Sequence, residues 1–293
     1  MRSTRISAIS ALQLGCSASL AQWRVLVLWW LAGLVPAVWL TRQVARAANE
    51  VFAHHPDAVR IISEPDFAAL ADAWLAHEIS AKLGSHLLPP LLLLVLLAPW
   101  SAGIAVTGLR ASKPPGFIAL ILGGLREYAP QLRLYLLALL PLLLTLPVAL
   151  IALSVADMKA AQAITYSQAA PWHYGARGFS ALLVLLPLAS IEAGRTAFAA
   201  DPALRSALLA LGRGWRLIYR RFFAWLGICS LTWAAGVAAG TALHASGQLS
   251  GNTWLALACT QVAVTAIGWS RLARLCALLQ LHTGQQSNAM QKP

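Results

Sequence analysis

The chain has 293 residues, of which 59% are hydrophobic and only 11% are charged, and its formal net charge is +12. A soluble domain has roughly a quarter of its residues charged, and a soluble fold of this length could not bury so much apolar surface. The composition therefore excludes an ordinary soluble protein. It predicts an all-α integral membrane protein, since a long apolar run satisfies its own backbone groups in lipid only as a helix.

Six apolar stretches are each long enough to cross the hydrocarbon layer, which takes about 20 residues in a helix. In chain order, the six predicted transmembrane helices are 25–41, 86–109, 134–156, 178–200, 222–244 and 254–278. The last two come from one uncharged stretch between Arg221 and Arg271, which the turn-forming sequence of 246–252 divides into a hairpin. The whole chain, 1–293, is thus predicted to be a single membrane domain.

The largest predicted loop is the outer segment, about 42–85, which follows the first span. Apolar residues recur at helical spacing between Ala69 and Ala81, so a helix is expected that lies on the outer membrane surface or docks another protein. Several histidines also belong to this segment, among them His54 and His55, but their spacing is not that of a metal site. No metal ion and no other cofactor is therefore expected.

Basic residues alternate between crowded and sparse loops. Sixteen of the 22 lie before the first span, between the second and third, between the fourth and fifth, and at the end of the sixth. They are Arg2, Arg5, Arg24, Arg110, Lys113, Arg126, Arg133, Arg195, Arg205, Arg213, Arg216, Arg220, Arg221, Arg271, Arg274 and Lys292. Because cytoplasmic loops are enriched in Lys and Arg, the alternation predicts that both termini are cytoplasmic. It also explains the net charge as four cytoplasmic patches, so no nucleic-acid partner is expected.

The most arginine-rich loop is predicted to form an interfacial amphipathic helix. Asp201-Pro202 is typical of a helix start, with a capping carboxylate followed by a proline. On a helical wheel, one side carries Arg205, Arg213, Arg216 and Arg220, and the other carries Leu208, Leu211, Trp215, Ile218, Tyr219 and Phe222. The arginines are expected to face anionic headgroups. The pattern fits simple anchoring of the topology, and it also fits recognition of a specific lipid or a partner membrane protein.

The two longest cytoplasmic loops share a short pattern. Arg126-Glu127-Tyr128 followed by Arg133-Leu134-Tyr135 matches Arg213-Gly214-Trp215 followed by Arg220-Arg221-Phe222 in its basic and aromatic positions. Each copy comes just before a span, which suggests that the second and third spans with their loop repeat the fourth and fifth with theirs. A composition this rich in such residues would also produce the match by chance.

Glu192 is the only acidic residue inside a predicted span, and Arg195 follows it by three residues. At that spacing the two side chains can meet on one face of a helix, so they are predicted to form an ion pair within the membrane. An ionisable residue in a membrane helix is costly and marks a candidate functional site. Two interpretations stay open at this point, a structural ion pair and a site that couples to a proton or a substrate.

Three stretches carry a resemblance to a known group of proteins. They are His55-Pro56-Asp57 to Phe67, then Glu192-Ala193-Gly194-Arg195 with Asp201, then Leu211-Gly212-Arg213-Gly214-Trp215-Arg216. In these the chain resembles uncharacterised bacterial six-span membrane proteins, akin to the membrane portions attached to some glycerophosphodiester phosphodiesterases. The resemblance implies a bacterial inner-membrane location. It brings no established activity, and without a phosphodiesterase domain in this sequence it implies no catalysis.

The function expected from these features is that of a non-enzymatic inner-membrane component with an accessory, assembly or envelope-maintenance role. Its arginine-rich inner helices would contact anionic membrane lipids or a membrane-protein partner. The alternative is a secondary transporter or lipid-handling permease that uses Glu192 and Arg195. No set of nucleophile and base residues at a recognisable spacing supports an enzyme.

Overall fold

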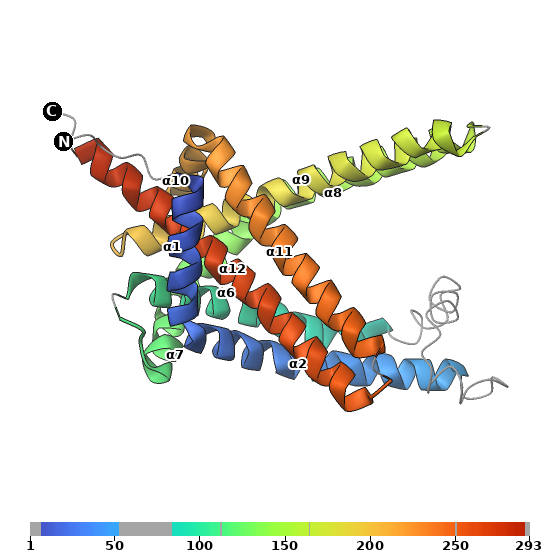
Figure 1. Cartoon of the computed structure of the whole chain (residues 1–293), viewed down its shortest axis with the longest axis horizontal. Helices are drawn as coiled ribbons and strands as arrows, with labels where there is room; N and C mark the ends of the chain where they lie inside the picture. Colours follow the sequence, from blue (N-terminus) through green and yellow to red (C-terminus); the bar gives the residue numbers. More distant parts are fainter. Residues whose placement is uncertain (1–6, 53–83, 112, 164, 250, 291–293) are drawn as a thin grey trace.

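A computed structural model describes residues 7–52, 84–111, 113–163, 165–249 and 251–290, and these residues contain helices and no strand (Figure 1). The helices are α1 (Ala8–Ala21), α2 (Trp23–Phe52), the 3-10 turn η1 (Gly84–Leu87), α6 (Leu88–Arg110), α7 (Phe117–Arg126), α8 (Tyr128–Ala161), α9 (Tyr166–Ala200), α10 (Ala207–Arg220), α11 (Phe222–Leu249) and α12 (Thr253–Met290). Most of the predicted outer segment, with His54, His55 and the helix expected at 69–81, lies outside the described residues.

Six of these helices contain stretches long and apolar enough to cross a membrane, which confirms that part of the sequence prediction. The stretches are Trp23–Ala47, Leu88–Arg110, Tyr128–Ala161, Ser167–Ala200, Phe222–Leu249 and Trp254–Thr283, and each overlaps one predicted span. The helices extend beyond the predicted limits, because a helix does not end where its side chains become polar. In particular, α2 continues to Phe52, so the first part of the predicted outer segment is helical.

The three short helices α1, α7 and α10 gather at one end of the molecule, together with the last turns of α12 (Figure 1). The described ends of the connections α2–α6, α8–α9 and α11–α12 point the opposite way. We call the end that holds the short helices the inner end. The first and last described helices, α1 and the end of α12, both lie at this end.

The described chain divides into three similar units, each with a short helix followed by a hairpin of two long helices. The units are α1–α2–α6, α7–α8–α9 and α10–α11–α12. In every unit a single polar residue separates the short helix from the first long helix, namely Gln22, Glu127 or Arg221. We call α2, α8 and α11 the odd spans and α6, α9 and α12 the even spans.

Each short helix packs on the even span of the preceding unit through a glycine, so the backbones approach closely. A Cβ atom added to Gly124 of α7 would lie 2.8 Å from Ile104 of α6, and one added to Gly214 of α10 would lie 2.8 Å from Gly194 of α9. A Cβ atom on Gly15 of α1 would lie 2.7 Å from the Ala277 nitrogen of α12. The packing is therefore cyclic, with the first unit resting on the last.

The predicted repeat paired the second and third spans with the fourth and fifth, whereas the units seen here join α8 with α9 and α11 with α12, and the register differs as well. In the structure Gly124 is equivalent to Gly214. The predicted alignment of Arg126 with Arg213 is shifted from this equivalence by about one helical turn. A third copy, with Gly15, precedes the first span.

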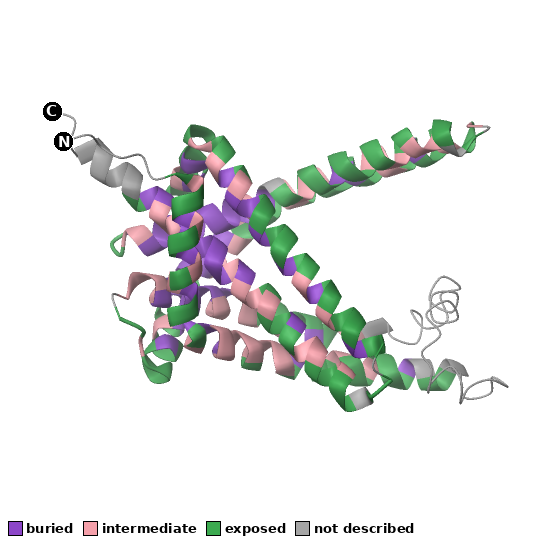
Figure 2. Cartoon of the chain, viewed as in Figure 1, coloured by how far each residue is buried: buried purple, intermediate pink, exposed green. Residues whose placement is uncertain are grey.

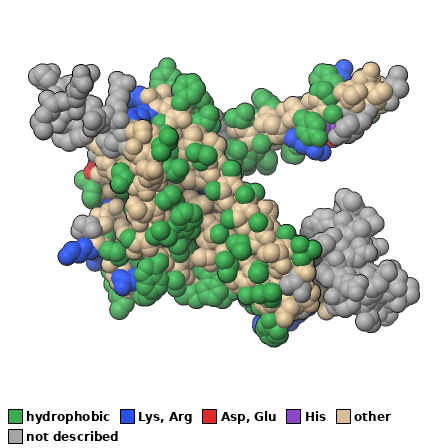
Figure 3. Space-filling view, viewed as in Figure 1, with side chains coloured by type: hydrophobic (Ala, Val, Ile, Leu, Met, Phe, Trp, Pro, Cys, Tyr) green, Lys and Arg blue, Asp and Glu red, His purple; other side chains and the backbone are tan. Residues whose placement is uncertain are grey.

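The even spans form the centre of the fold near the inner end. Their inner portions are buried continuously over 102–106, 191–199 and 272–278, as Figure 2 shows in purple. The α8–α9 hairpin instead projects away from α11 and α12, and it exposes apolar side chains such as Leu144 and Leu182 along its length (Figure 3). The buried inner portions are where the charged residues of the even spans meet.

Candidate functional site

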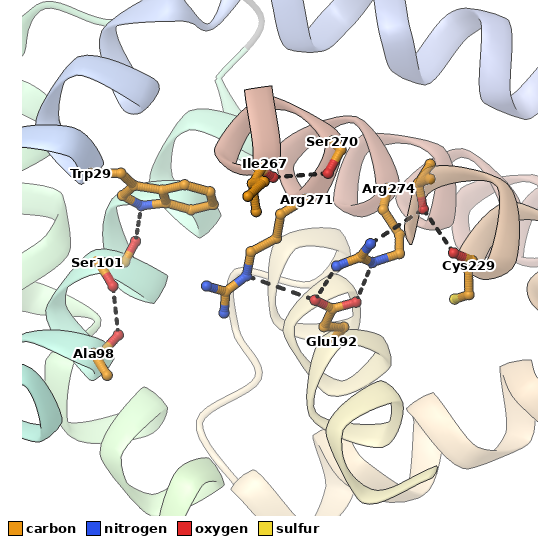
Figure 4. Close-up of polar contacts among 10 residues, drawn as sticks. Trp29, Ala98, Ser101, Glu192, Cys229, Ile267, Ser270, Arg271 and Arg274 are labelled. Carbon is orange, nitrogen blue, oxygen red and sulfur yellow. Dashed lines mark hydrogen bonds and ion pairs between the residues drawn. The ribbon is translucent and has the colours of Figure 1, made fainter. Parts of the chain in front are cut away.

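Glu192 of α9 pairs with Arg274 of α12 inside the helix bundle (Figure 4). The Arg274 Nε donates to Glu192 Oε2 at 2.5 Å and its Nη2 donates to Glu192 Oε1 at 2.8 Å, so the pair is bidentate. The remaining guanidinium nitrogen, Nη1, donates to Thr232 Oγ1 of α11 at 3.2 Å. Both charged side chains are almost fully buried, and Trp233 covers the guanidinium at 4.8 Å from its ring centroid. This pair therefore ties α9, α11 and α12 together.

Arg271 lies one turn further out on α12 and forms a longer ion pair with the same carboxylate (Figure 4). Its Nε is 3.7 Å from Glu192 Oε1, and it makes no hydrogen bond to any described residue. Its guanidinium stacks 5.4 Å from the ring centroid of Trp29 on α2, and the Trp29 Nε1 donates to the Ser101 carbonyl oxygen at 2.7 Å. The Arg271 side chain is 41% exposed, so its remaining donors are accessible.

Arg195 of α9 and Glu192, for which the spacing predicts an ion pair, form no direct bond in the structure, where Glu192 pairs with Arg274. Three residues turn a helix through about 300°, so the two side chains diverge by about 60°. Glu192 points to α12, while the Arg195 guanidinium lies 4.8 Å from the ring centroid of Tyr135 on α8. Arg195 is only 2% exposed, and its Nε has no hydrogen-bond partner among the described residues.

These residues line a cavity of about 440 Å³ between α8, α9, α11 and α12. The lining residues that carry its chemistry are Tyr135, Glu192, Arg195, Trp233, Arg271 and Arg274. This volume lies within the range of roughly 300–1,000 Å³ that is usual for small-molecule sites. With three guanidinium groups and one carboxylate, the lining carries an excess of two positive charges. We call this set of residues the arginine site.

The arginine site is suited to an anionic ligand. Buried polar groups in proteins are nearly always hydrogen-bonded, and a buried charge is costly unless it is paired. Arg274 meets this requirement within the protein, whereas the Nε of the buried Arg195 has no partner among the described residues. Across the described residues, no group of three or more His, Cys, Asp or Glu side chains could hold a metal ion. The unused donors therefore point to an acceptor-rich anion as the ligand.

A second acidic residue, Glu127, lies at the break between α7 and α8 with two arginines. Arg110 donates from Nη1 to Glu127 Oε1 at 2.6 Å, and Arg205 approaches the same oxygen at 3.3 Å. Arg110 also donates from Nε and Nη2 to the Phe198 carbonyl oxygen at 3.1 and 2.7 Å. This carbonyl belongs to the last turn of α9, whose C-terminal oxygens lack helical partners. The cluster thus holds the end of α9 against α6.

The helix predicted to start at Asp201 starts later, at Ala207. Asp201 follows the last residue of α9, and its Oδ1 accepts from the Ala203 nitrogen at 3.0 Å. The N-cap of α10 is Ser206, whose hydroxyl accepts from the Leu209 nitrogen. Arg205 therefore precedes the helix and does not belong to its polar side. The prediction failed because Asp201 stabilises a turn directly after α9 and does not cap the next helix.

The charged residues of α10 have different surroundings. Arg213 pairs with Asp201 at 2.7 Å, and this guanidinium lowers the pKa of the Asp201 carboxyl below its ordinary value. Arg216 and Arg220 are exposed and have no partner among the described residues. Leu208, Trp215, Tyr219 and Phe222 from the predicted apolar side are exposed as well, while Ile218 is buried. The helix packs on α9 through the side that carries small residues, Ala210 and Gly214.

Sequence reasoning missed Arg271 and Arg274 as site residues, because it counted them only as inner-side charges at the end of the sixth span. Both lie within the predicted limits of that span, three residues apart, as Glu192 and Arg195 do in the fourth. The presence of two charged residues inside a predicted span was the signal that could have identified them as site residues.

Comparison with known proteins adds no relative to this picture. No protein-family model, no curated protein and no solved structure matches the chain.

Proposed function

We propose that this chain is a lipid-handling protein of the bacterial inner membrane, which binds the anionic phosphate headgroup of a lipid in the arginine site. In this proposal six helices cross the bilayer and both termini lie in the cytoplasm. The distribution of the basic residues supports that orientation. The exposed apolar side chains along the odd spans support insertion, since lipid is their natural environment. No catalytic step is part of the proposal.

The observation that carries the proposal is the buried guanidinium of Arg195, whose Nε is left without a hydrogen-bond partner among the described residues. Arg195 is 2% exposed, and it faces a cavity. A guanidinium that served only in a structural ion pair would have no donor left without a partner. An arginine buried without a counterion is destabilising, so its presence is best explained by a ligand that supplies the missing negative charge.

Phosphate is the anion that fits these groups. A guanidinium presents its N–H donors in a planar fork that matches phosphate oxygens in pairs. Arg195 from α9 and Arg271 from α12 both face the cavity; the Arg195 Nε has no hydrogen-bond partner among the described residues, and the Arg271 guanidinium is 41% exposed. Two excess positive charges balance the one or two negative charges of a phosphate group. The apolar residues that line the same cavity, among them Leu188, Ile191 and Ile267, favour a phosphate carried by a lipid.

The short inner helices have a separate role in this proposal. The exposed aromatic and aliphatic residues of α10 lie in the interface, beside the exposed Arg216 and Arg220. An interfacial helix with these features binds anionic headgroups from the inner leaflet. This contact anchors the protein, whereas the arginine site inside the bundle selects a ligand.

The proposal is tested with a matched pair of double variants. Arg195→Gln/Arg271→Gln removes two charges from the arginine site, and Arg216→Gln/Arg220→Gln removes two from the surface of α10. Each purified protein is titrated with phosphatidylglycerol in neutral detergent, and the bound lipid is counted by native mass spectrometry. We expect the first variant to bind at least about tenfold more weakly than wild type and the second to bind within a few-fold.

Equal binding by wild type and the Arg195→Gln/Arg271→Gln variant would contradict the proposal. An equal loss in both variants would also contradict it, because retention would then depend on total charge and not on the arginine site. Size-exclusion profiles that match wild type show that each variant is folded.

The accessory or envelope-maintenance role remains a prediction beside this proposal. The exposed side of α10, with Trp215 and Tyr219, is the surface on which a partner membrane protein would dock. Recovery of a stoichiometric protein partner after gentle purification, lost in a Tyr219→Ala variant, would favour that role.

A further inference from the structure

A second cavity, of about 370 Å³, lies between α2, α6 and α12. Its lining includes Ile267 and Arg271, which also line the arginine site, so the two cavities are neighbours. Figure 4 shows the shared region, with Arg271 between Trp29 on one side and Glu192 on the other. We call this second cavity the tail pocket.

The tail pocket extends from the level of Arg271 toward the middle of the bundle. On α12 its lining runs outward from Arg271 to Val264, and on α6 from Ser101 to Leu94. Seven residues of helix correspond to about 10 Å. On α2 the lining begins at Leu26, near the inner end, and reaches Pro36. All three helices thus line it in the direction that leads from the inner surface toward the bilayer centre.

Apart from Arg271, the side-chain hydrogen-bonding groups of the tail pocket are already used within the protein. Trp29 Nε1 donates to the Ser101 carbonyl oxygen at 2.7 Å, and Trp30 Nε1 donates to Gln261 Oε1 at 2.8 Å. The hydroxyls of Ser101 and Thr265 donate to carbonyl oxygens of their own helices at 2.9 Å each. The remaining lining is apolar. This pocket offers nothing to a polar ligand and suits a hydrocarbon chain.

We infer that the ligand of the arginine site is an anionic phospholipid whose acyl chain occupies the tail pocket. This inference rests on the function proposed above. The headgroup phosphate lies between Arg195 and Arg271, and the chain passes Arg271 and runs along Trp29, Trp30 and Gly33. The protein thereby distinguishes a lipid from a free phosphate, because only a lipid fills both cavities.

Gly33 provides a direct way to fill the tail pocket. It belongs to its lining, and a Cβ atom added there meets no atom within 4 Å. Gly33→Phe therefore places a side chain in the pocket without a backbone clash. Gly227 of α11 is a matched control, since its Cβ also meets nothing within 4 Å and it lines neither cavity. Gly33→Leu supplies a smaller side chain in case the phenylalanine impairs folding.

The experiment measures binding of dioleoyl- and dihexanoyl-phosphatidylglycerol to the full chain in neutral detergent. We expect wild type and Gly227→Phe to bind the long-chain lipid at least about tenfold more tightly than the short-chain lipid. Gly33→Phe is expected to lose this preference while it binds the short-chain lipid as wild type does. Gly33→Leu is expected to show a partial loss.

Long-chain binding by Gly33→Phe at the wild-type level would overturn this inference alone, provided that Arg195→Gln/Arg271→Gln binds poorly. Loss of both lipids in Gly33→Phe would also overturn it, since the pocket would then act on the headgroup. If wild type binds neither lipid, or if the arginine variant binds both normally, the proposed function fails and this inference fails with it.

Discussion

Glu127 and Glu192 are both buried glutamates that two arginines approach, yet the two clusters differ in what remains unpaired. Around Glu127, each of the three nitrogens of Arg110 donates a hydrogen bond, two of them to the end of α9, and the buried atom left without a partner is an acceptor, Glu127 Oε2. The second arginine there, Arg205, is largely exposed to the surroundings. Around Glu192, Arg274 is equally well bonded, but Arg271 reaches the carboxylate only at 3.7 Å, and the Nε of the buried Arg195 has no hydrogen-bond partner among the described residues.

Free hydrogen-bond donors, and not charge alone, therefore distinguish a binding site from a structural cluster. A protein gains stability when a buried arginine is fully bonded, and it loses stability when donors are left unused. The Glu127 cluster is thus explained by the packing of α6, α7 and α9. The arginine site has donors that packing leaves unexplained.

The largest effect is expected from Glu192→Gln, because this change leaves Arg274 buried without a counter-charge. Breaking a buried ion pair in this way costs about 3–5 kcal/mol. Unfolding in detergent, followed by circular dichroism, measures the loss in the free energy of unfolding. Glu127→Gln is the matched change in the other cluster and is expected to cost less, since Arg110 keeps its bonds to Phe198. Equal losses would remove the contrast between the two clusters.

The next effect is expected from Arg110→Gln, which removes both hydrogen bonds to the Phe198 carbonyl oxygen and one to Glu127. We expect a loss of about 2 kcal/mol in the free energy of unfolding, since hydrogen bonds to charged groups contribute roughly 1.5–3 kcal/mol. Phosphatidylglycerol binding should stay within a few-fold of wild type once the protein is folded. A large loss of lipid binding would assign this cluster to the ligand as well.

Arg195→Met is expected to act in the opposite direction on stability. Replacing an unpaired buried charge by an apolar side chain of similar length should raise the free energy of unfolding by about 1 kcal/mol when no lipid is present. The same variant should lose the stabilisation that added phosphatidylglycerol gives to wild type. Melting curves with and without lipid measure both effects. Destabilisation in the absence of lipid would show that Arg195 has a partner of its own.

The smallest effect concerns the ion pair between Asp201 and Arg213. The pair lowers the pKa of Asp201 in the folded state, so its stabilisation is present above the unfolded pKa and is lost as the pH falls through the folded pKa. Wild type should therefore lose slightly more stability between pH 5 and about pH 2 than Asp201→Asn does. Melting temperatures of the two proteins across this range test the point. Parallel curves would show that the pair does not contribute.

The long helices were predictable because length and apolarity are local properties of the sequence. The apolar run around Leu144, for example, predicts a span without any knowledge of its neighbours. The start of α10 was harder to predict, since Asp201 and Ser206 are both acceptable N-caps. Only the path of the chain after α9 selects Ser206.

The partners of the charged residues could not be predicted. Spacing along one helix suggested Arg195 for Glu192, whereas the partner that bonds it is Arg274, 82 residues away. Which arginine bonds to Glu192 depends on how α9 and α12 pack. The spacing of residues within one helix carries no information about that packing. The contact of Gly15 with Ala277 was hidden for the same reason, because nothing near Gly15 in sequence indicates which helix it touches.

The packing of α1 on α12 has a consequence for the order in which the protein is made. Among the described helices, α1 is synthesised first, and α12, which receives Gly15, is synthesised last. The first two units can assemble as they emerge, but the cycle closes only after α12 has been made. Arg271 and Arg274 belong to α12, so the arginine site is completed at that same step.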